Sequence, residues 1–177
     1  MKILSFPASN SRHSINRELL KYAERFLDGC DIEHLDINDY EMPIYSIDRE
    51  HDTGIPEQAR QFLRKISEAD GLLIGFAEHN GNYTAAFKNL SDWCSRVDRN
   101  IYQHKKMVLL ATSPGMNGAG TVLEMAKTSV PFFGGEVVAS LSVPNFNDNF
   151  DSETGELTHK VLAGKLADAV GRLKASL

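Results

Sequence analysis

A polar segment near the start of the chain has the composition of an anion-binding loop. Residues 7–16 read Pro-Ala-Ser-Asn-Ser-Arg-His-Ser-Ile-Asn and contain no acidic side chain. An apolar run precedes them and a helical pattern follows, so the segment ends at a helix N-terminus, where free N–H groups favour a phosphate. The alternative is that Ser14 only caps the helix and the rest is an ordinary polar loop. The candidate ligand-binding residues are Ser9, Ser11, Arg12, Ser14, Ile15 and Asn16.

Two later segments, residues 77–83 and 112–120, also follow apolar runs and carry polar residues and glycines. Gly81 permits a tight turn or a close backbone approach to a ligand. Three glycines in the second segment could let a flat ring lie against the backbone, although a plain turn and a flexible connection are the alternatives. The candidate contacts are Glu78, His79, Asn80, Gly81 and Asn82 in the first segment, and Ser113, Pro114, Gly115 and Gly118 in the second.

The elements that must position these segments alternate along the chain. Short apolar runs predict strands, and apolar residues at helical spacing predict amphipathic helices. Residues 38–54 show no clear period and contain Pro43 and Gly54, so we expect a long loop there. The expected strands are residues 3–6, 32–35, 71–76, 107–111 and 137–143, and the expected helices are residues 14–27, 55–66, 86–97, 122–130 and 162–177.

Strands that alternate with helices predict an α/β fold with helices on both faces of a parallel sheet. At this size we expect a three-layer, flavodoxin-like, doubly wound sheet of five strands in the order 2-1-3-4-5, formed by a single domain of residues 1–177. Ligands of such sheets bind beyond the carboxyl ends of the strands, where the strand order reverses. All three polar segments follow strands close to that point.

Composition excludes several classes of function. A net charge of −5 argues against a nucleic-acid partner, which needs a clustered basic face. The opening apolar run is too short for a signal peptide or a membrane span, so we expect a cytoplasmic protein. Cys30 and Cys94 have no metal-ligand or redox spacing, and we expect both to be buried and inert with no metal site. The phosphate motifs GxxxxGK[ST] and GxGxxG are absent.

These three segments resemble those of the NADPH-dependent FMN reductase family, which includes quinone, chromate and azo-dye reductases. The family pattern GSxRxxSxN is matched by Ser9, Ser14 and Asn16, whereas Ala8 replaces glycine and Ser11 stands where arginine is usual, with Arg12 one step on. The pattern PEYNGxxxxxLKNxxDW is matched by Glu78, Asn80, Gly81, Lys88, Asn89, Asp92 and Trp93, with Ala77 for proline and His79 for tyrosine. Ser113-Pro114-Gly115 with Gly118 resembles the third loop.

The resemblance implies that the first segment binds the phosphate of FMN and that the other two flank the flavin ring. It implies hydride transfer from NADPH or NADH to the flavin and then to a quinone or similar small oxidant, in a homodimer or homotetramer. Because the cofactor carries this chemistry, no catalytic side chain is named. The alternatives are an electron carrier without nicotinamide chemistry, and a hydrolase or regulatory domain that uses the same crevice.

For some side chains the sequence leaves two or more roles open. His79 could stack on the ring, donate to it or stay on the surface. The remaining histidines are expected to be solvated, although His13, beside the expected phosphate, could have an electrostatic role. The apolar residues 40–45 mark either a contact surface or a loop folded back on its own domain. Phe87 and Trp93 could join such an interface, but core packing is the reading we favour for Phe87.

Overall fold

The computed structural model describes residues 1–177 and contains the predicted parallel sheet. Its strand order is β2-β1-β3-β4-β5, which confirms the flavodoxin-like topology expected from the sequence. The three central strands are buried on both faces, which explains their continuous apolar sequences. The strands are β1 (Lys2–Ala8), β2 (Asp31–His34), β3 (Gly71–Phe76), β4 (Lys106–Thr112) and β5 (Glu136–Val143).

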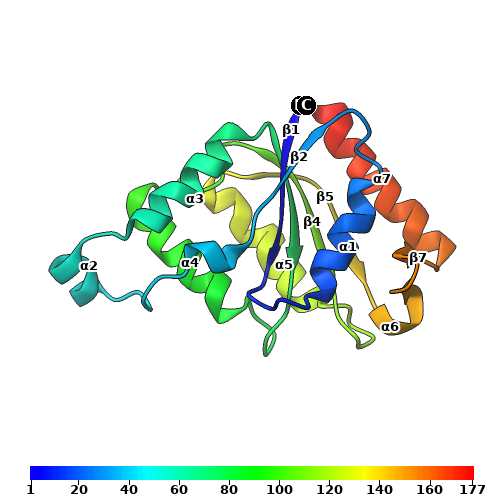
Figure 1. The fold of residues 1–177 in the computed structure, drawn as a ribbon, viewed down its shortest axis with the longest axis horizontal. Coiled ribbons are helices and arrows are strands. Elements are labelled where there is room, and N and C mark those ends of the chain that lie inside the picture. The colour runs from blue at the N-terminus through cyan, green and yellow to red at the C-terminus, as the bar shows by residue number, and fades with distance from the viewer.

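Helices cover both faces of this sheet (Figure 1). One hydrophobic cluster joins a face of the sheet to α1 and α7, and the other joins the opposite face to α3, α4 and α5. Successive residues of β1 point to opposite clusters, with Ile3 in one and Leu4 in the other. The helices are α1 (Ile15–Glu24), α3 (Glu57–Glu68), α4 (Ala85–Val97), α5 (Gly120–Ser129) and α7 (Lys160–Ser176).

The prediction of a long loop over residues 38–54 is wrong. A 3₁₀ helix, η1 (Ile37–Tyr40), and a short helix, α2 (Ile47–Thr53), lie in this stretch. Ser46 caps α2, since its Oγ accepts the N–H of Arg49 at 3.2 Å. No residue of α2 is buried, so no apolar period marks the helix in the sequence. Figure 1 shows α2 projecting from the body of the molecule.

Smaller elements complete the chain. The 3₁₀ helix η2 (Val130–Phe133) follows α5, and α6 (Phe146–Asn149) precedes the strand pair β6 (Phe150–Asp151) and β7 (Glu156–Leu157). None of the helices combines the length and the apolar character that a bilayer crossing requires. Cys94 is buried, and burial raises the pKa of its thiol to about 12. Cys30 is only half-buried, so the expectation that both cysteines are buried is wrong for this one.

Candidate functional site

The loop between β1 and α1 presents a set of unpartnered backbone donors. The helix begins at Ile15 after the N-cap residue Ser14. The first N–H groups of any helix have no partner inside it, and here several loop N–H groups are free as well. The N–H groups without a hydrogen-bond acceptor in the chain belong to Ser9, Asn10, Arg12, Ser14, Ile15 and Asn16.

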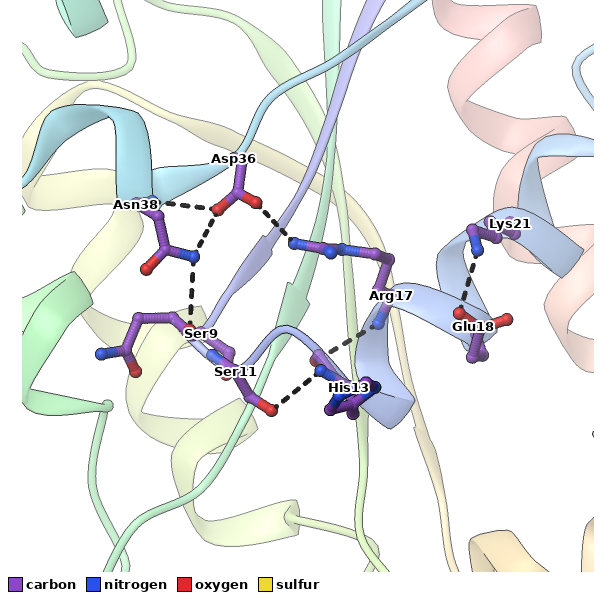
Figure 2. A network of polar contacts seen from close by, with 10 residues as sticks. Ser9, Ser11, His13, Arg17, Glu18, Lys21, Asp36 and Asn38 are labelled. Carbon is purple, nitrogen blue, oxygen red and sulfur yellow. Dashed lines mark hydrogen bonds and ion pairs between the residues drawn. The ribbon is translucent and has the colours of Figure 1, made fainter.

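Serine hydroxyls hold the conformation of this loop. Ser9 Oγ accepts the N–H of Ser11 at 3.2 Å, and Ser11 Oγ accepts the N–H of His13 at 3.3 Å (Figure 2). Ser14 Oγ accepts the N–H of Arg17 at 3.4 Å and caps α1. A hydroxyl that accepts such a bond keeps its own proton to donate. These serines can therefore hold the loop and bind an anion at the same time.

The charge around the loop is favourable to an anion. Arg12 is exposed and forms no ion pair. Asp36, a carboxylate close to the loop, pairs with Arg17 at 3.0 Å (Figure 2). Burial opposes ionisation of Asp36, but hydrogen bonds from Asn38 and the charge of Arg17 outweigh it and lower the pKa of this carboxyl. Asn38 also donates to the carbonyl of Asn10 at 3.2 Å, which ties the loop to η1.

The loop after β3 is a tight hairpin. His79 and Asn82 exchange two backbone hydrogen bonds of 2.9 and 3.1 Å. Asn80 and Gly81, at φ 53° and 74°, have the left-handed conformation that a two-residue turn of this kind requires. The N–H groups of these two tip residues are unpaired, and the His79 side chain is exposed.

The loop after β4 is held against the end of β5. Gly118 has a φ of 57°, and a Cβ atom there would lie 2.4 Å from Ser142 Oγ and 2.8 Å from the backbone nitrogen of Pro144. The carbonyls of Ser113 and Gly115 accept N–H groups from residues 146 and 145. Gly118 is therefore needed for close packing, whereas Pro114 and Gly115 remain exposed at the tip.

Two side chains connect these loops to one another. The Asn16 amide pairs with Thr112 at the end of β4, accepting its N–H at 3.0 Å and donating to its carbonyl at 3.3 Å. Glu78 accepts the N–H of Val122, in the first turn of α5, at 2.9 Å. These contacts bring the three loops together at one edge of the sheet. Both polar atoms of the Asn16 side chain are used in the pair with Thr112, so the free donor at this position is the backbone N–H.

Thr84 was not among the predicted site residues. It donates to the carbonyl of Ala8 at 3.0 Å and caps α4 by accepting the N–H of Phe87 at 3.2 Å. The hairpin is thereby fixed to the end of β1. A threonine ahead of a helical pattern is a recognisable N-cap signal, but nothing in the sequence points to its second partner.

Asn89 and Trp93, which match the later part of the family's second sequence pattern, lie on α4 and away from the three loops. Asn89 Nδ2 donates to the carbonyls of Met42 and Pro43 at 3.0 and 3.1 Å, and its Oδ1 accepts the N–H of Tyr45 at 2.9 Å. Trp93 is buried and donates its Nε1–H to Pro43 at 2.7 Å. These two side chains fasten the segment before α2 to α4. Trp93 is therefore a core residue, as is the buried Phe87.

Comparison with known proteins decides the family. The model of a family described as NADPH-dependent FMN reductase matches residues 1–148. The chain belongs to this family. A 2-hydroxy-1,4-benzoquinone reductase from Burkholderia is 34% identical over 119 residues, which cover 67% of this chain and 63% of that protein. An NADPH:quinone oxidoreductase from Arabidopsis thaliana is 27% identical over 134 residues, 73% of this chain and 67% of that protein.

Solved structures agree on the fold of this FMN reductase family member. The flavoenzyme FerB, an NAD(P)H:acceptor oxidoreductase from Paracoccus denitrificans, superposes with a TM-score of 0.73 at 23% identity, over 98% of this chain and 97% of that one. An FMN-dependent azoreductase from Bacillus anthracis, solved with FMN, gives a TM-score of 0.68 at 13% identity, over 98% of this chain and all of that one.

The donor set after β1 fits the phosphate of FMN, the cofactor of this family. A dianion needs several N–H or O–H donors and no competing carboxylate, and residues 7–16 meet both conditions. The largest cavity, of about 570 Å³, lies elsewhere, between α1 and the edge strand β2. The candidate flavin site is therefore located by the hydrogen-bond donors of the loops and not by the volume of a cavity.

Proposed function

We propose that this FMN reductase family member takes reducing equivalents from NADPH or NADH and passes them to a quinone or similar small oxidant in the cytoplasm. The observation that carries the proposal is the group of free N–H and O–H donors between β1 and α1, beside two further loops with unpaired N–H groups. The names of the relatives from Burkholderia and Arabidopsis support a quinone as acceptor.

Each loop has a separate task in this proposal. The loop of residues 9–16 binds the phosphate through backbone N–H groups, with Ser9 and Ser14 as additional donors and Arg12 as a nearby charge. FMN bound there supplies the redox chemistry, because it can accept a hydride and release electrons to an acceptor. The free N–H groups of Asn80, Gly81 and Gly115 donate to the polar edge of the ring. Donors fixed in this way stabilise an electron-rich ring.

We also propose that the protein forms a homodimer or homotetramer. Ile44, just before α2, is 76% exposed, and Ile47, the first residue of α2, is 51% exposed. Both lie on a segment that hydrogen bonds from Asn89 and Trp93 hold against α4. Because this segment is already ordered, little conformational entropy would be lost when its apolar surface binds a second copy. Sedimentation of the wild type and of Ile44→Glu tests this. A wild-type monomer would contradict it, as would a variant whose assembly is unchanged.

An anaerobic reduction experiment tests the function. We expect FMN-loaded protein to lose its visible flavin absorbance when NADPH or NADH is added, and to recover it when a quinone is added. A flavin that stays oxidised with both nicotinamides but is reduced by dithionite would support the electron-carrier alternative. Protein that does not bind FMN would contradict both.

A further inference from the structure

The largest cavity of the molecule lies outside the three loops. It measures about 570 Å³, within the range of small-molecule sites, and is bordered by α1 and by the strands β1 and β2. It exists because α1 packs over β1, β3 and β4 and leaves this face of the edge strand β2 without a covering helix. Pro7 and Leu20 provide apolar wall, whereas the Leu35 side chain is buried in the cluster on the opposite face of the sheet.

A nearly buried carboxylate borders this cavity. The Glu24 side chain is only 10% exposed, and His34 Nδ1 lies 3.5 Å from its Oε1. Oε1 also accepts the hydroxyl proton of Ser5 at 2.6 Å, whereas Oε2 has no hydrogen-bond partner in the chain. Burial raises the pKa of Glu24, against the opposing effect of the Ser5 hydrogen bond. The carboxylate thus keeps one oxygen free to accept a donor from outside the chain. His34, expected to be simply solvated, is exposed but contributes to this group.

The cations that border the cavity are already paired. Arg17 binds Asp36 at 3.0 Å, and Lys21 binds Glu18 at 3.0 Å (Figure 2). Asp39 also borders the cavity and forms no ion pair. The unneutralised charge is therefore negative, which disfavours an anion. No cluster of three metal-ligating side chains is present here or elsewhere, and the walls are partly apolar.

We propose that this cavity binds a small organic cation. An ammonium, amidinium or guanidinium group pairs with Glu24 at the polar end, and an apolar body lies against Pro7 and Leu20. Such a group would give Oε2 the donor that it lacks. The proposal does not depend on the flavin chemistry, because the cavity shares none of the free N–H donors of residues 9–16.

Binding of benzamidine and of its neutral analogue benzamide to the FMN-loaded full chain tests this site. In amide NMR titrations we expect benzamidine to shift the resonances of Ser5, His34 and their neighbours, and to bind about tenfold more tightly than benzamide. Saturating FMN keeps the flavin site filled. The comparison of the two probes uses wild-type protein, so it does not depend on whether a variant folds.

Variants of two glutamates complete the test. Glu24→Gln should remove the preference for benzamidine, while Glu136→Gln, at an exposed glutamate of β5 that forms no ion pair and does not border the cavity, should retain it. Equal affinity for the two probes would overturn the proposal. So would an undiminished preference in Glu24→Gln, or shifts confined to the three flavin loops.

Discussion

Removal of the Ser9 and Ser14 hydroxyls should weaken FMN binding much more than riboflavin binding. Both hydroxyls accept a backbone N–H and keep a proton that can be donated to a phosphate. Hydrogen bonds to a charged group contribute about 1.5–3 kcal/mol each, and competition from water and neighbouring N–H groups reduces the sum. For Ser9→Ala/Ser14→Ala we expect a loss of about 1–3 kcal/mol, a rise in Kd of about 5- to 150-fold.

The assay is a fluorescence titration of the apoprotein with each flavin. Riboflavin lacks the phosphate, so its Kd should stay the same in the double variant. Loss of the Ser14 cap should cost about 1 kcal/mol of folding stability, which lowers Tm without changing the riboflavin affinity. Ser152→Ala is the matched control, because Ser152 lies between β6 and β7, is exposed, and forms no side-chain hydrogen bond. An unchanged FMN affinity, or an equal loss for both flavins, would refute the reasoning.

Three further predictions concern stability and reactivity. Asn89→Ala removes three hydrogen bonds to the segment before α2 and should lower the free energy of unfolding by about 2–4 kcal/mol in urea titrations. A loss below about 0.5 kcal/mol would contradict the view that Asn89 fastens this segment to α4. Gly118→Ala should destabilise the protein by more than about 1 kcal/mol, whereas Gly164→Ala, at an open position on α7, should be neutral or stabilising; the reverse order would show that the crowding at Gly118 is tolerated. Cys94 should resist a thiol reagent until the protein unfolds, while the other cysteine reacts in the native state, and two equivalents labelled natively would contradict this.

The sheet order and the three loops could be predicted from the sequence because they depend on local signals. Continuous apolar runs mark the buried central strands, and helical spacing marks the helices that cover them. Helix α2 could not be predicted in this way, since it buries no residue and its only local signal is the Ser46 cap. The positions of the loops followed from the topology rule for parallel sheets.

The contacts that assemble the site could not be predicted. Glu78 and Val122 are 44 positions apart, and Asn16 and Thr112 are 96 apart. Each pair meets only because the parallel strands end at the same edge of the sheet. The Glu24 carboxyl illustrates the same limit, because its environment depends on an edge strand that no helix covers. The assignment of ligand-binding residues within residues 9–16 and in the other loops stays a prediction.

The most direct test of that assignment is a crystal structure of the protein with FMN. We predict that the phosphate lies within hydrogen-bonding distance of backbone N–H groups of residues 10–16 and of the Ser9 or Ser14 hydroxyl, with the ring beside the loops that follow β3 and β4. A phosphate bound anywhere else, with those donors facing water or the protein's own side chains, would contradict it.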